Sequence, residues 1–324
     1  MLLEQRRDYE QQRGRERNLE DLEPQLSISE ADGVELSVLP SVEESTILFL
    51  HVFKCAGTSL RQVFLEWAKS EGWTGAIVIE CRDIREANER RICLNSQNDI
   101  KDMAKEKWLV RGQKALVGHF FWDFRNYVQE PYLMITTLRN PLELFVSALQ
   151  FKNREQTRTL NGAVQLATES MQTSLSRKDP NEIGFVRRFL DQDAANDYRT
   201  YRTYAPEEYA AMVSSAVDHL NTFWVVGVVE QYEGFLEVLE AVLDPFSTNA
   251  PLWRKAHLVA SNGSPVHSSD VLANVEPEVA RQFNSSVLGP QWQFYEVALD
   301  LWDSRCREVL PVENHDRFCS VKHH

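Results

Sequence analysis

Three short segments of the chain combine residues that could hold a phosphate or move a proton. The first is Lys54-Cys55-Ala56-Gly57-Thr58-Ser59. It follows an apolar run typical of a buried strand, and a helical pattern begins directly after it. Such a junction exposes backbone N–H groups at the start of the helix, where they bind phosphate. Gly57 would let the backbone approach the anion. Thr58 and Ser59 could add hydroxyl donors, and Lys54 would supply a positive charge.

This segment does not have the spacing of a Walker A loop. In GxxxxGK[ST] the lysine follows the second glycine, whereas Lys54 precedes Gly57, the one glycine of the segment. An ordinary strand–helix turn with a solvated lysine explains the local pattern equally well.

The second segment carries Arg139 and Ser147. Arg139 follows an apolar run at 132–138, so it would lie at the carboxyl end of a strand, where open α/β sheets bind their ligands. Its forked guanidinium suits a phosphate because it can bind two oxygens. Ser147 lies two turns into the helix expected next, where its hydroxyl needs a partner. The alternative role for Arg139 is an ion pair with a loop carboxylate.

His119 is the candidate for a general base. It follows the small apolar stretch Ala115–Gly118 and precedes the aromatic segment 120–124. Histidine is the usual general base near neutral pH. A histidine among aromatic residues is more often structural, so the pattern alone leaves both roles open.

The elements that would position these residues alternate between strands and helices. Apolar runs at 46–53, 132–138 and 223–229 are typical of buried strands, and each precedes apolar residues at helical spacing. After the second run, Asn140-Pro141 supplies a helix cap and a proline at the first helical position. This alternation predicts an α/β fold with a central, mainly parallel sheet flanked by helices.

Together the three segments resemble the Golgi carbohydrate sulfotransferases, the family that includes the heparan sulfate and uronyl 2-O-sulfotransferases. LHVFKCAGTSLRQ is similar to the family's 5′-phosphosulfate loop, ITTLRNPLELFVSAL to its 3′-phosphate motif, and VGHFFWDF to the segment with its proposed catalytic histidine. The resemblance extends from about Thr46 to Arg307. Two departures stand out. Phe53 replaces the usual proline, and Glu143-Leu144 replaces a common x-Arg.

The resemblance implies a P-loop-NTPase-like sulfotransferase fold that uses 3′-phosphoadenosine 5′-phosphosulfate as donor. The donor's sulfuryl group would pass in line to a hydroxyl of a carbohydrate or other hydroxylated acceptor. Lys54 and the loop residues up to Ser59 would bind the donor and stabilise the leaving 5′-phosphate. Arg139 and Ser147 would anchor the 3′-phosphate, and His119 would accept the proton of the acceptor. The scheme requires no metal.

The sequence does not identify the acceptor. The chain has 35 Lys and Arg residues against 48 Asp and Glu, a formal charge of −13, which argues against a nucleic-acid partner. Residues that could line a basic groove for an anionic glycan are Arg187, Arg188 and Arg202, with Arg199, Arg254 and Lys255 as further candidates. For any one of them, solvated surface charge is the more common role. A neutral glycan or a smaller hydroxylated acceptor fits as well, and a homo-oligomer stays open.

Composition divides the chain into three expected parts. These are a charged N-terminal tail or stem at 1–45, a sulfotransferase domain at 46–310 and a C-terminal tail at 311–324. No apolar run approaches the ~20 residues of a membrane span. The N-terminus also lacks the apolar core of a signal peptide. The expected compartment is therefore the Golgi lumen if an anchor precedes this chain, and the cytoplasm otherwise. Cys306 and Cys319 could pair in an oxidising compartment.

Two other functions stay open at this point. A P-loop kinase-like phosphotransferase would share the fold and the phosphate cradle, although the Walker A spacing and a clear Mg²⁺-binding aspartate are missing. A degenerate family member would bind a glycan without catalysis. The joint presence of Lys54, His119, Arg139 and Ser147 argues against it, whereas Phe53 keeps it open.

Overall fold

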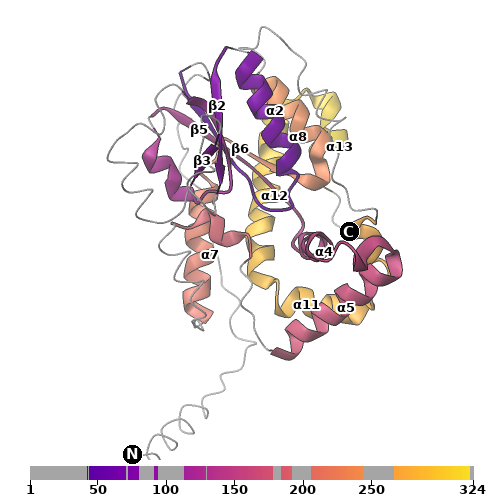
Figure 1. Ribbon diagram of the computed structural model, residues 1–324. Helices are drawn as coiled ribbons and strands as arrows, with labels where there is room; N and C mark the ends of the chain where they lie inside the picture. The colour runs from indigo at the N-terminus through magenta and orange to yellow at the C-terminus, as the bar shows by residue number, and fades with distance from the viewer. Residues whose placement is uncertain are drawn as a thin grey trace, which may run out of the picture. The chain divides into compact units, whose positions relative to one another are not determined.

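A parallel sheet forms the centre of the molecule (Figure 1). The structure, a computed structural model, describes residues 42, 44–70, 72–79, 91–93, 113–128, 130–177, 184–191, 206–243 and 266–321. The strands are β1 (Thr46–Leu50), β2 (Thr74–Ile79), β3 (Arg91–Cys93), β4 (Gln113–Gly118), β5 (Tyr132–Leu138) and β6 (Val225–Val228). They form one six-stranded sheet in the order β3-β2-β4-β1-β5-β6, and every neighbouring pair is parallel. The predicted α/β fold is confirmed.

Helices follow the strands as the sequence pattern predicts. The described α-helices are α2 (Gly57–Ser70), α4 (Pro141–Lys152), α5 (Leu160–Arg177), α7 (Pro206–Leu220), α8 (Tyr232–Leu243), α10 (Ser268–Leu272), α11 (Pro277–Ser286), α12 (Gly289–Val309) and α13 (His315–Phe318). Short 3₁₀ turns are η4 (Trp122–Tyr127), η5 (Gln156–Arg158), η6 (Val186–Phe189), η7 (Val229–Gln231) and η10 (Val312–Asn314). Helix α2 packs on β2 and β4, and α12 packs on β6. Helices α11 and α12 follow each other closely in the chain and are separated at Val287-Leu288.

Strand β1 is the centre of the core. All five of its residues are buried, because it pairs with β4 on one side and β5 on the other while helices cover its faces. A smaller apolar cluster lies apart from this core, among α4, α5, α10 and α11. Helix α4 contributes Leu144 to the main core and Val146 to the smaller cluster. It therefore fixes the helical layer to the carboxyl end of β5.

The C-terminal residues differ from the tail that the sequence indicated. Cys319 is buried and forms a disulfide with Cys306 of α12. Gln231 also donates a hydrogen bond from Nε2 to the carbonyl of Ser320 at 2.8 Å. The segment up to residue 321 is thus packed against the domain. Nearly all of the expected N-terminal tail lies outside the described residues. Within the described ranges, no helix has both the length and the apolar character needed to cross a membrane.

Candidate active site

The loop between β1 and α2 has a backbone path suited to an anion. Lys54 and Ala56 adopt left-handed conformations, with φ of 65° and 56°, which non-glycine residues rarely do. Two neighbouring threonines of β5 support the loop. Thr137 donates from its hydroxyl to the carbonyl of Cys55 at 2.6 Å, and Thr136 donates to that of Leu50 at 2.9 Å. Strained backbone held in this way is common at functional sites.

The first turn of α2 leaves backbone donors available. The N–H groups of Ser59 and Leu60 donate to the carbonyl of Ala56. The N–H groups of Ala56, Gly57 and Thr58 donate to no residue in the described part of the chain. No acidic residue lies in this turn. The start of α2 therefore has three N–H groups with no acceptor among the described residues, at the positive end of a helix dipole, which is an arrangement that can bind an anion.

Lys54 keeps its charge available because aromatic rings, not carboxylates, surround it. Its Nζ lies 4.8 Å from the centroid of Phe151, and the guanidinium of Arg154 packs on the same ring at 4.7 Å. Phe53 contacts Phe151 edge-on. Among the described residues, no carboxylate pairs with Lys54. Burial, followed by the charges of Arg139 and Arg154, lowers the pKa of the Lys54 ammonium. The positive charges of the two arginines thus influence the ammonium of Lys54.

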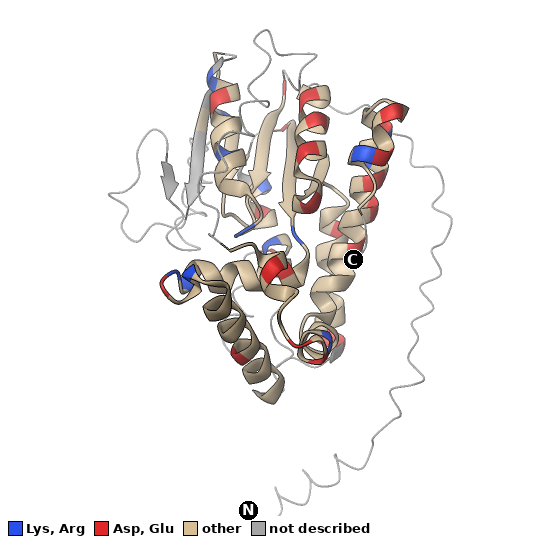
Figure 2. Cartoon of the chain, turned by 90° about the vertical axis from the view of Figure 1, so that its right-hand side faces the viewer, with Lys and Arg blue, Asp and Glu red and all other residues tan. Residues whose placement is uncertain are grey.

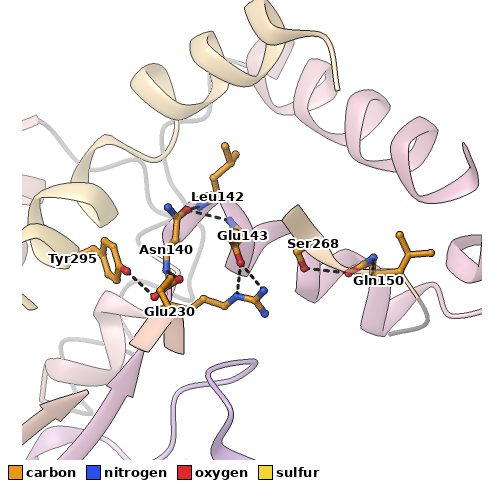
Figure 3. Close-up of polar contacts among 9 residues, drawn as sticks. Asn140, Leu142, Glu143, Gln150, Glu230, Ser268 and Tyr295 are labelled. Carbon is orange, nitrogen blue, oxygen red and sulfur yellow. Dashed lines mark hydrogen bonds and ion pairs between the residues drawn. The ribbon is translucent and has the colours of Figure 1, made fainter. Parts of the chain in front are cut away.

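The turn that carries Arg139 is fixed from both sides (Figure 3). The side-chain oxygen of Asn140 accepts hydrogen bonds from the N–H groups of Leu142 and Glu143, which caps α4 as predicted. From the other side, Glu230 accepts a hydrogen bond from the backbone N–H of Asn140 at 2.7 Å. Arg139 itself pairs with Glu143, at 2.7 Å from Nη2 to Oε2. Arg139 is thus ion-paired, but its partner is a carboxylate of α4 and not the loop carboxylate of the alternative considered above.

Helix α4 connects the two phosphate motifs. Glu143, Ser147 and Phe151 are spaced i, i+4 and i+8, so they share one face of the helix over about 12 Å. Glu143 at one end contacts Arg139, and Phe151 at the other contacts Lys54. Ser147 lies between them, buried, and makes no hydrogen bond through its hydroxyl to any described residue. A cationic side chain thus lies beside each end of this face, Arg139 beside Glu143 and Lys54 beside Phe151.

His119 follows β4, and its tautomer is set by its surroundings. Its Nδ1 lies 2.8 Å from the carbonyl oxygen of His51. Because a carbonyl only accepts, Nδ1 must carry the proton, and the lone pair of neutral His119 is then on Nε2. The rings of His51 and His119 stack with centroids 4.1 Å apart. Burial and the neighbouring His119 lower the pKa of His51, so His51 favours its neutral form. The arrangement suits His119 to accept a proton at Nε2.

The comparisons with known proteins decide the family. A profile of the Sulfotransferase family matches residues 42–251. The chain belongs to the sulfotransferase family. No curated protein matches the chain. The matched residues of this sulfotransferase contain the loop after β1, His119 and the whole Arg139–Ser147 segment. In the described part of the chain, no group of three or more His, Cys, Asp or Glu side chains is arranged to hold a metal ion.

The basic residues of the sulfotransferase considered for the acceptor are only partly described. Arg188 of η6 donates from Nη1 to the carbonyl of His119 at 3.4 Å and packs on Phe121. Arg187 lies on the same turn and is half-buried. The remaining candidates, Arg202, Arg199, Arg254 and Lys255, lie outside the described residues. Figure 2 shows Asp and Glu along the helices, and Lys and Arg near the lower ends of the strands with acidic residues beside them.

Sequence reasoning missed three residues at this site. These residues are His51, Arg154 and Glu230. The sequence signal for His51 was its place three residues before Lys54. For Glu230 it was a carboxylate directly after a buried strand, at the edge of the sheet where Arg139 was expected.

Gly57 makes room for His51, which leads to a stability prediction. A Cβ at Gly57 would overlap the imidazole of His51. We therefore expect Gly57→Ala to lower the free energy of unfolding by about 1–3 kcal/mol, as overpacking does in buried sites. Gly289→Ala is the matched control, because a Cβ there meets nothing within 4 Å. Denaturant unfolding of both variants checks this, and equal stability of the two would contradict it.

Proposed function

We propose that this sulfotransferase transfers the sulfuryl group of 3′-phosphoadenosine 5′-phosphosulfate to a hydroxyl of a carbohydrate or another hydroxylated acceptor. The observation that carries the proposal is the face of α4, which connects the Lys54 loop with Arg139. Two anion anchors on one rigid element match a nucleotide with phosphate groups at both its 5′ and its 3′ position. ATP has no 3′-phosphate, so the Arg139 end of this face favours the phosphosulfate donor.

Each group at the site has a role in the proposed transfer. The oxygen of the acceptor hydroxyl forms a bond to sulfur, and the bond from sulfur to the 5′-phosphate oxygen breaks in line with it. The proton of the hydroxyl passes to Nε2 of His119. The leaving 5′-phosphate gains negative charge, which Lys54 and the N–H groups at the start of α2 stabilise. Arg139 and Ser147 hold the 3′-phosphate throughout.

The acceptor sits, in this proposal, on the side of His119 that Arg188 borders. Arg188 contacts the backbone of His119 and packs on Phe121, so its charge is fixed close to the base. Arg187 and Arg202 remain further candidates for contacts with an anionic glycan.

A screen with labelled donor tests the function. The protein is incubated with donor carrying ³⁵S and a panel of neutral glycans, glycosaminoglycans and small hydroxylated compounds, with EDTA present. We expect label on at least one acceptor class, and the same rate with and without EDTA. A parallel reaction uses ATP labelled at the γ-phosphate, with Mg²⁺. Transfer of phosphate with no transfer of sulfur would overturn the proposal in favour of a phosphotransferase.

A further inference from the structure

Arg139, the residue proposed to anchor the 3′-phosphate, is paired with a carboxylate. One oxygen of Glu143, Oε2, accepts hydrogen bonds from Arg139 Nη2 at 2.7 Å and from Arg139 Nε at 3.3 Å. The two side chains are 18% and 26% exposed, so the pair is largely sheltered from water. Charge-assisted bonds of this kind are strong, and a partly buried pair is screened less than a surface pair.

The backbone of the turn that carries Arg139 is held independently of the Glu143 side chain. The carboxylate of Glu230 accepts one hydrogen bond from the N–H of Asn140 and another from the hydroxyl of Tyr295, each at 2.7 Å. Both bonds go to groups other than the guanidinium of Arg139. Burial raises the pKa of the Glu230 carboxyl, and these two donors oppose that effect. The carboxylate of Glu143 is therefore not needed to fix the backbone of the turn, and it contacts the guanidinium of Arg139.

We propose that Glu143 determines how tightly the enzyme holds the 3′-phosphate of its nucleotide, and so how fast the spent nucleotide leaves. The inference rests on the proposed function. Glu143 lies one helical turn from Ser147 on the same face of α4, so a phosphate held by Arg139 and Ser147 lies beside this carboxylate. Like charges at such a distance repel, and Glu143 also offsets part of the positive charge that attracts the phosphate. Release of product limits turnover in many enzymes, and a weakened anchor speeds that step.

The variant Glu143→Gln tests whether Glu143 acts through its negative charge or by positioning Arg139. Glutamine has the same length, and its side-chain oxygen can still accept from Arg139, but the negative charge is gone. The probes are 3′-phosphoadenosine 5′-phosphate and adenosine 5′-phosphate, which differ only in the 3′-phosphate. We expect the variant to bind the first about five- to tenfold more tightly, as removal of one like charge at a partly screened site predicts. Its dissociation should slow by a similar factor. Affinity for adenosine 5′-phosphate should change less than about twofold.

Glu278→Gln is the matched control. Glu278 pairs with Arg281 on α11 in an exposed ion pair, so this change removes one negative charge without touching Arg139. We expect it to leave both affinities unchanged. Unchanged or weaker binding of 3′-phosphoadenosine 5′-phosphate by Glu143→Gln would overturn the inference and assign Glu143 to positioning Arg139. An equal increase in the affinity of Glu143→Gln for both nucleotides would also overturn the inference. If the unmodified protein binds neither nucleotide, the proposed function itself fails, and the inference with it.

Discussion

His119→Ala is expected to slow sulfuryl transfer by about 10²–10⁴-fold while leaving binding of 3′-phosphoadenosine 5′-phosphate unchanged. A hydroxyl is a poor nucleophile near neutral pH, so the reaction depends on a group that takes its proton. The hydrogen bond from Nδ1 of His119 to the carbonyl of His51 places the accepting lone pair on Nε2. Steady-state rates with a labelled donor, combined with calorimetric titration of the nucleotide, measure the two quantities separately.

The pH dependence of kcat/KM is a second test of His119 as the general base. We expect kcat/KM to fall on the acid side, because an imidazole that is already protonated cannot accept the proton of the acceptor. Burial lowers the pKa of His51, so that neighbouring ring favours its neutral form. His315→Ala is the control, since His315 also bonds a backbone carbonyl but lies near the C-terminus. Near-normal activity of a folded His119→Ala protein would exclude His119 as the general base. A large fall in its melting temperature together with lost activity would instead indicate a structural histidine.

Lys54→Ala is expected to lower kcat by about 10²–10³-fold and to weaken nucleotide binding much less. The ammonium is needed most when the leaving 5′-phosphate gains charge, so its effect is concentrated in the transition state. Lys54 packs on Phe151 and has no carboxylate partner among the described residues, so the substitution leaves no unpaired acid behind. Single-turnover rates with saturating donor measure this effect.

The control for Lys54 is a nearby exposed cation. Lys152 lies in the last turn of α4, on the helix that also carries Phe151, and is exposed. Lys152→Ala should leave kcat and KM within about twofold of the unmodified protein. If Lys54→Ala raised KM alone and left kcat intact, Lys54 would bind the ground state only, and its catalytic role would be wrong.

The features of this site that could be predicted are those that residues close together in the sequence encode. The change from a strand pattern to a helical one around Lys54 is a property of neighbouring residues, and so is the Asn140-Pro141 cap. Both therefore appear in the structure where the sequence indicates them. The ion pair between Arg139 and Glu143 is also local, at i and i+4, and the sequence raised an ion pair as one of two roles for Arg139.

Contacts between segments that are distant in the chain could not be predicted from the sequence. His51 meets His119 because β1 and β4 pair in parallel, with Leu50 opposite Gly118, so that the next residue of each strand lies side by side. This register depends on the order of strands in the sheet, which periodicity does not give. Glu230 reaches Asn140 across 90 residues for the same reason, since β5 and β6 are neighbours. The positions of the main motifs were thus predictable, whereas the side chains that orient them were not.

Calorimetric titration with 3′-phosphoadenosine 5′-phosphate and with ADP tests the central claim most directly, because only the first carries a 3′-phosphate. The account predicts that the unmodified protein prefers 3′-phosphoadenosine 5′-phosphate. It also predicts that Arg139→Ala loses about 2–4 kcal/mol of that binding while the affinity for ADP stays the same. Equal affinity of the unmodified protein for the two nucleotides would contradict the assignment of Arg139 and Ser147 to a 3′-phosphate, and with it the proposed donor.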